Sequence, residues 1–100
     1  MTNNYPVFRF ENEFTEVDEF EMPLKGFRDD IIVSCSNGKS YKLCFYDGVR
    51  LSQDLEVEEI LFIEGLVIVK EVNLYYIQKA IDRMWDFNFF EELKPITILG

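Results

Sequence analysis

Histidine is absent from this chain of 100 residues, and cysteine occurs only twice, as Cys35 and Cys44. Without an imidazole the commonest general base is missing, and a nucleophilic cysteine would have no such base beside it. Two cysteines without CxxC spacing or a histidine cannot build a zinc site. We therefore expect no metal, no cofactor and no enzymatic activity, and two free thiols that pack as small apolar side chains. An enzyme would have to work with carboxylates alone.

Positive charge is also scarce. Ten Lys and Arg residues stand against nineteen Asp and Glu residues, which gives a net charge of −9 at pH 7. The basic residues are scattered singly, so neither nucleic acid nor an anionic membrane surface is expected as a partner. A basic protein is expected instead, because complementary charge steers association. The alternative is that the surplus charge serves only to keep the protein in solution.

Long apolar runs are missing as well. The longest ones are too short to cross a bilayer, and residues 1–6 contain neither the basic nor the apolar region of a signal peptide. These two absences favour a cytoplasmic protein. What the chain does contain is 48% hydrophobic residues, ten of them Phe, which is enough to build the core of a single domain over residues 1–100.

The order of sequence patterns predicts an α+β fold, with a mostly antiparallel sheet of about five to seven short strands and one C-terminal helix packed on one face. Residues 1–30 carry the weakest pattern. Residues 7–10 are expected as a short strand, and residues 20–24 as an edge strand, because Pro23 cannot donate to a ladder.

Residues 31–57 are expected to form a three-stranded meander. A loop over residues 36–38, with Gly38 in the left-handed conformation, pairs Val33 with Tyr41. This register places the two cysteines on opposite faces of the hairpin, where a disulfide cannot form. Alternation of apolar and polar residues at the end of this segment predicts its third strand, with one buried face.

The second half of the chain predicts a hairpin and then the helix. Two short apolar runs within residues 60–69 indicate an apolar hairpin at the centre of the sheet. Asn73 is a good N-cap, and apolar residues recur after it at helical spacing, so the helix is expected over residues 73–87. Residues 96–99 could add a last strand or merely dock on the domain.

Acidic residues gather in two places. Six acids fall within residues 11–21 without a basic residue among them, and four fall within residues 54–59. In the predicted third strand, acids at alternate positions share the outward face, and such a row of like charges costs stability unless a partner offsets it. The predicted partner-binding residues are Asp54, Glu56, Glu58, Glu59, Glu16, Asp18 and Glu19. The doublet Asp29-Asp30 is interpreted as solvated surface, since neighbouring acids in a strand make no chelate.

In size, acidity and lack of catalytic side chains, the chain is similar to small bacterial immunity proteins, which plug the basic active sites of toxins. This is a similarity of class and not of residues. It implies a small acidic binding module that docks a basic protein such as a nuclease toxin. The alternative is a non-catalytic structural or assembly subunit, a homo-oligomer, marked by an exposed apolar patch on residues 60–69 or on the helix.

Overall fold

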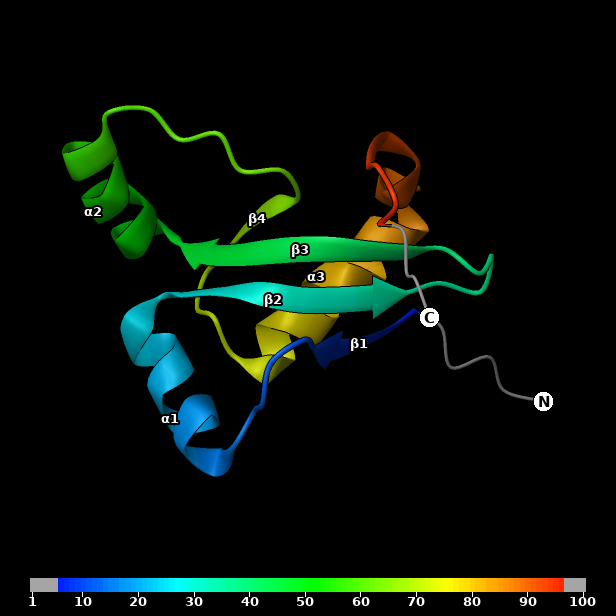
Figure 1. Cartoon of the computed structure of the whole chain (residues 1–100), viewed down its shortest axis with the longest axis horizontal. Helices are drawn as coiled ribbons and strands as arrows, with labels where there is room; N and C mark the ends of the chain where they lie inside the picture. The colour runs from blue at the N-terminus through cyan, green and yellow to red at the C-terminus, as the bar shows by residue number, and fades with distance from the viewer. Residues whose placement is uncertain (1–5, 97–100) are drawn as a thin grey trace.

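A computed structural model describes residues 6–96 of the chain. Within this range the chain forms four strands, three α-helices and one 3-10 helix, in the order β1 (Val7–Phe10), α1 (Glu16–Lys25), β2 (Phe27–Ser34), β3 (Ser40–Asp47), α2 (Gly48–Glu58), β4 (Leu66–Val69), α3 (Leu74–Asp86) and η1 (Phe89–Glu92). In Figure 1, α3 crosses behind the sheet, while α1 and α2 lie at one end of it. The expected α+β class is confirmed, but residues 6–96 form fewer strands and more helices than predicted.

The sheet is mixed, with the strand order β1-β2-β3-β4. The first three strands pair antiparallel, and β4 runs parallel to β3. The predicted register of the central hairpin is confirmed, because Val33 lies opposite Tyr41 and Ile31 lies opposite Leu43. Gly38 has a φ of 82°, as the three-residue loop requires.

The predicted third strand of the meander is wrong, because residues 48–58 form α2. Asp47 begins this helix as its N-cap, and its carboxylate accepts a hydrogen bond of 2.8 Å from the backbone N–H of Arg50. Alternation over a short segment favoured a strand, but the apolar side chains at Leu51 and Leu55 also fit helical spacing. The capping side chain decides between the two patterns.

The helix at this position also removes the predicted hairpin over residues 60–69. Parallel strands need a crossover connection, and α2 with the loop that follows it supplies one between β3 and β4. Residues 60–63 have no regular structure. Gly65 then packs against β3 so closely that a Cβ atom would lie 2.4 Å from the Lys42 carbonyl oxygen, and its φ is 74°. Only glycine fits this approach.

The edge strand predicted for residues 20–24 is also wrong, since these residues belong to α1. Thr15 and Asp18 form a capping box, in which the Thr15 N–H donates to the Asp18 carboxylate at 2.8 Å and the Asp18 N–H donates to the Thr15 hydroxyl at 3.3 Å. Pro23 lies in the second half of the helix, close to its end at Gly26. The cap therefore outweighs the short alternation that favoured a strand.

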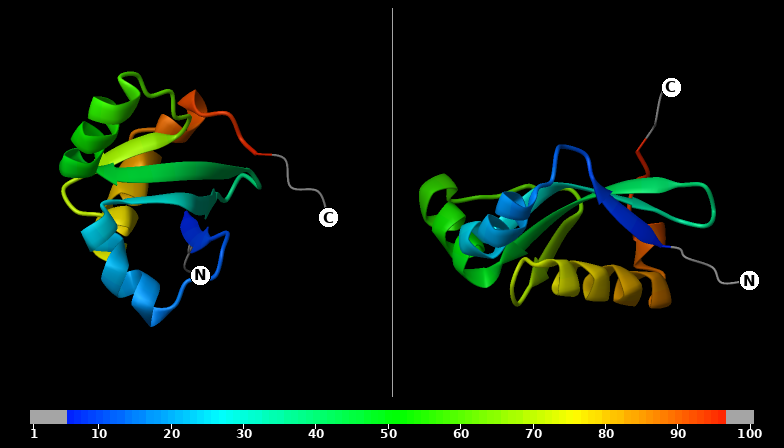
Figure 2. Two further views of the ribbon diagram at one scale, coloured as in Figure 1. Left: turned by 60° about the vertical axis from the view of Figure 1, so that its left-hand side comes forward. Right: turned by 90° about the horizontal axis from the view of Figure 1, so that it is seen from below.

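The apolar core lies between one face of the sheet and α3, as the right-hand view of Figure 2 shows. The helix expected over residues 73–87 is present as α3, and the Asn73 side chain accepts from the backbone N–H of Tyr76 at 2.8 Å. Ile77 and Ile81 are fully buried against the sheet. None of the helices within residues 6–96 is long and apolar enough to cross a membrane.

Both cysteines are free and buried, as predicted. Cys35 belongs to the core beneath α3, whereas Cys44 is buried outside that core cluster. Beyond η1, Ile96 forms a single antiparallel bridge to Ser40 of β3, with an N–H to carbonyl distance of 2.8 Å. The remaining residues of the predicted last segment, 97–99, lie outside the described residues.

Candidate interaction surface

One end of the molecule carries both predicted acidic clusters. Helix α1 leads into the start of β2 and α2 leaves the end of β3, and these two strand ends are neighbours because β2 and β3 are antiparallel. Two hydrogen bonds join the helices here: Asp47 N–H donates to the Gly26 carbonyl at 2.9 Å, and Arg50 Nη1 donates to the Lys25 carbonyl at 3.0 Å. We call α1, α2 and residues 59–64 together the acidic end.

A polar cluster fastens α2 to the sheet. The Asp54 carboxylate accepts from the Tyr46 hydroxyl at 2.7 Å and from Arg50 Nε at 2.9 Å, and the Arg50 guanidinium lies 4.2 Å from the centre of the Phe27 ring. The hydrogen bond to Asp54, together with burial, raises the pKa of Tyr46 to about 12. The hydrogen bonds from Tyr46 and then Arg50 lower the pKa of Asp54. Asp54, predicted to bind a partner, therefore has structural partners of its own.

The helical conformation also rearranges the other predicted residues of this cluster. On a strand, Asp54, Glu56 and Glu58 would form one outward row. On α2, Glu58 follows Asp54 by one turn, while Glu56 lies on the opposite side of the helix. The predicted single row of charges is therefore wrong, although Glu56, Glu58 and Glu59 are all exposed to solvent.

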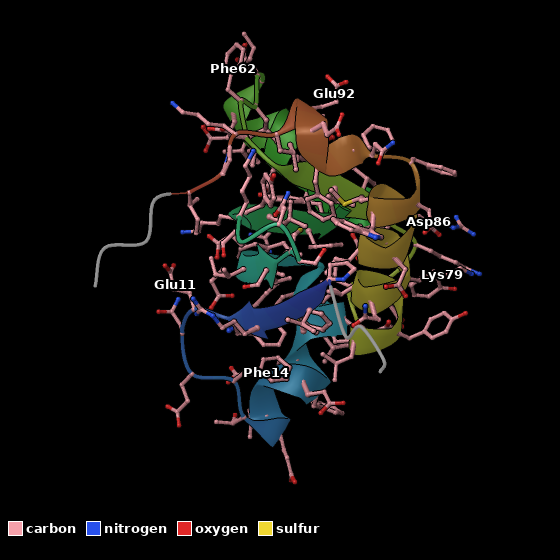
Figure 3. All side chains as sticks on the ribbon, turned by 90° about the vertical axis from the view of Figure 1, so that its right-hand side faces the viewer. Glu11, Phe14, Phe62, Lys79, Asp86 and Glu92 are labelled. Atoms are coloured by element: carbon pink, nitrogen blue, oxygen red, sulfur yellow. The ribbon has the colours of Figure 1, made fainter. Side chains whose placement is uncertain are left out.

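The end of α2 combines these three acids with large apolar side chains. We call Glu56, Val57, Glu58, Glu59, Ile60 and Phe62 the α2 tip. The exposed fractions are 79% for Val57 and 93% for Phe62, and Figure 3 shows Phe62 projecting away from the ribbon. The last turn of α2 has no basic residue, although the C-terminal end of a helix favours cations. Glu59 ends the helix with a φ of 66°, which is uncommon outside glycine.

The second predicted cluster lies at the start of α1. Glu16, Asp18 and Glu19 occupy the first turn of the helix, where negative charge is stabilised by the helix dipole. The backbone N–H and hydroxyl of Thr15 lower the pKa of Asp18 by hydrogen bonding to its carboxylate. Asp18 is thus a capping residue, and the other two acids are exposed.

Sequence reasoning missed an exposed apolar stripe on the same helix. Val17, Phe20 and Leu24, which we call the α1 stripe, are exposed by 64, 74 and 75%. Their spacing of three and four residues places them on one side of α1, whereas Met22 is buried on the other side. The spacing was visible in the sequence, but assigning residues 20–24 to a strand hid it.

Asp30 is buried, so its predicted place on the solvated surface is wrong. Arg28 donates to both of its carboxylate oxygens, with 3.1 Å between Nη2 and Oδ2, and the backbone N–H of Asn12 donates at 2.9 Å. Burial alone would raise the pKa of Asp30, but the hydrogen bonds from Arg28 and from the Asn12 backbone, together with the Arg28 charge, outweigh it and lower the pKa. A register shift in β2 between Arg28 and Ile31 accompanies this pair.

A hollow of about 630 Å³ lies beside β3, among Cys44, Tyr46, Lys42, the turn at Gly65 and residues 93–96. Burial, with the charges of Asp29 and Asp54, raises the pKa of the Cys44 thiol to about 11, so it stays protonated at neutral pH and is a poor nucleophile. Within residues 6–96, no group of three or more Cys, Asp or Glu side chains is placed to hold a metal ion. Apolar side chains such as Phe27, Ile63 and Leu93 line much of this hollow, beside Asp29, Lys42 and Lys94.

Comparisons of the chain with protein-family models, with curated proteins and with solved structures found no match.

Proposed function

We propose that this chain is a small non-catalytic binding module that docks a basic protein through its acidic end. The observation that carries the proposal is the α2 tip. Three carboxylates lie at the end of a helix where they are electrostatically unfavourable, and none of them has an ion pair within residues 6–96. A cationic partner would convert this unfavourable arrangement into binding free energy.

The exposed apolar side chains of the tip support the same proposal. Charged surfaces give steering and specificity, whereas large apolar or aromatic side chains supply most of the affinity in protein interfaces. Phe62 and Ile60 are exposed and follow Glu59 closely in the chain, so the tip offers apolar side chains as well as charge. A surface kept only for solubility would have no use for them.

The partner class that fits best is a basic protein whose own site binds negatively charged ligands. A nuclease toxin is one such protein, because its active site is lined with cations that hold phosphate. The carboxylates of the α2 tip would then take the place of the phosphate charge. Function in the cytoplasm and the class-level similarity to immunity proteins are parts of this proposal.

The experiment uses the full chain as bait in lysate from its own source, washed at low and at high salt. We expect a basic protein that is retained at low salt and released at high salt. The double variant E56K/E58K should lose it, and with the purified partner its affinity should fall by at least about tenfold, since close charge pairs couple strongly.

A matched control is D86K/E91K, which changes the net charge by the same amount but alters exposed residues of α3 and η1. The control should retain the partner. If both double variants lose the partner equally, net charge rather than the α2 tip determines capture. If neither loses it, the acids of the α2 tip do not hold the partner. Either outcome overturns the proposal.

A second candidate function, an assembly subunit that forms homo-oligomers, is favoured by the region around β4. This strand is at the edge of the described sheet, and an apolar groove of about 550 Å³ runs between it, Met84 and Phe89. Ile68 and Phe89 are exposed along this groove. Edge strands with exposed apolar side chains readily pair with another chain.

Sedimentation over a wide concentration range separates the two candidates. A subunit would self-associate, and Ile68→Lys should abolish its association because a charge on an edge strand opposes pairing. A chain that stays monomeric at the highest concentration is inconsistent with the second candidate.

A further inference from the structure

We infer that the α1 stripe is a docking site for a basic amphipathic helix of the partner. The inference rests on the proposed function, because it assigns a second contact and a secondary structure to the same basic partner. Helix α1 exposes more large apolar side chains than it buries. Met22 is its only buried residue, while three large apolar side chains on another side remain open to solvent.

The stripe has the geometry of a helix-packing surface. Val17, Phe20 and Leu24 follow one another at steps of three and four residues, so they form a ridge along the helix. Such a ridge fits the groove between side-chain rows of a second helix. Across seven residues the ridge is about 10 Å long, which corresponds to two turns of a partner helix.

Carboxylates border the stripe on both sides. At 3.6 residues per turn, Glu16 lies beside the ridge on one side and Glu21 on the other. Neither has an ion pair within the described residues, and the one basic residue of α1 is Lys25 at its end. Glu19, predicted from the sequence to bind a partner, lies farther round the helix, so Glu21 takes its place.

This charge arrangement selects the occupant. A helix with an apolar stripe flanked by Lys or Arg would pair its cations with Glu16 and Glu21 while its apolar side chains cover Phe20 and Leu24. A second copy of this chain is disfavoured, because packing α1 against another α1 would bring acidic borders face to face. Nucleic acid would be repelled by the same carboxylates.

The test measures the fluorescence anisotropy of labelled synthetic peptides with the full chain. The first peptide is an amphipathic helix with leucine on one stripe and lysine or arginine on its borders. The second has the same composition in scrambled order, and the third carries glutamate in place of the basic residues. We expect the first to bind and become helical by circular dichroism, and the other two to bind at least about tenfold more weakly.

Variants then locate the site. F20S/L24S should lower the affinity for the first peptide by about tenfold or more, because it removes the apolar anchors. E16K/E21K should also lower this affinity, and it should make the affinity less dependent on salt concentration. All four side chains lie outside the core, and thermal melts verify folding. The matched apolar control Y75S/F87S, at exposed side chains of α3 and its C-cap, should leave the affinity of the peptide unchanged, as should the matched charge control D86K/E91K.

Two outcomes overturn the inference. One is equal binding of the ordered and scrambled peptides, which would mean that charge alone attracts them. The other is that F20S/L24S leaves binding of both the peptide and the captured partner unchanged. If capture still depends on Glu56 and Glu58 in that case, the proposed function stands and only the α1 site fails. If F20S/L24S abolishes capture of the partner while E56K/E58K does not, the proposal that the α2 tip binds the partner fails, and the α1 site stands.

Discussion

The two helix environments of this protein differ sharply. Helix α3 has Ile77 and Ile81 fully enclosed against the sheet, whereas α2, which is described in full, has no buried residue. Packing of an apolar face therefore stabilises α3. Polar contacts hold α2 in place, through the N-cap Asp47, the Arg50 guanidinium and the Asp54–Tyr46 hydrogen bond.

This difference separates stability from recognition. Most helical stability in proteins comes from burying an amphipathic face, whereas α2 leaves most of its apolar side chains exposed. A helix that is kept in place by a few directed contacts can offer nearly all of its surface to a partner. The contrast between the two regions can be tested by substitutions whose effects should run from large beneath α3 to small on α2.

The largest effect is expected in the core. Ile81→Ala should lower the free energy of unfolding by roughly 3 kcal/mol, because it leaves a cavity in a fully packed layer. The same kind of truncation at exposed Ile60 should change it by less than about 0.5 kcal/mol. Urea denaturation followed by circular dichroism measures both. Equal losses at the two positions would mean that the acidic end is packed as tightly as the core.

The next effect is expected at the buried ion pair. Asp30→Asn should cost roughly 2 kcal/mol at pH 7, since the Arg28 guanidinium, mostly buried, loses its charge partner. The pKa of Asp30 is lowered in the folded state, so its contribution is present above about pH 4, the unfolded value, and is lost as pH falls through the folded pKa. The difference in the free energy of unfolding between the wild type and Asp30→Asn should therefore shrink in acid. A constant difference between pH 7 and pH 2 would contradict this.

The core and the acidic end also differ in how far the sequence predicted them. The register of β2 and β3 and the bounds of α3 followed from a loop glycine, a capping asparagine and a long apolar period. The acidic end did not, because alternation over residues 20–24 and 49–57 imitated strands. The caps at Thr15 and Asp47 were the signals for helices. Because residues 48–58 form a helix and not a strand, the chain crosses over and β4 pairs parallel to β3. The single wrong assignment of this segment therefore made the predicted sheet topology wrong as well.

The candidate site was predicted in part. Glu56, Glu58 and Glu59 are exposed at one end, as expected of partner-binding residues, while Asp54 and Asp18 are engaged in structural hydrogen bonds. Burial of Asp30 could not be predicted, because it depends on Arg28 and on the Asn12 backbone, which lies eighteen residues away in the chain. Tertiary contacts of this kind leave no local pattern.

A smaller and more local effect is expected at the cap of α2. Asp47→Ala should cost about 1 kcal/mol, because the backbone N–H of Arg50 loses its acceptor. The loss should be concentrated in α2, with faster hydrogen exchange of its amides and unchanged exchange in α3. Uniformly faster exchange in both helices would show that α2 unfolds only together with the core.

The smallest effect is expected at the α2 tip, and its sign is the informative part. Glu58→Lys should raise the melting temperature by about 2 °C, because it places a cation at the C-terminal end of the helix. The same substitution at Glu16, in the first turn of α1, should lower it by a similar amount. If Glu58→Lys stabilises the free protein and weakens binding of the captured partner, the acidic tip is retained at the expense of stability, as expected of a surface selected for binding. A destabilised Glu58→Lys variant would mean that Glu58 supports the fold, and the main argument for the tip as an interface would be lost.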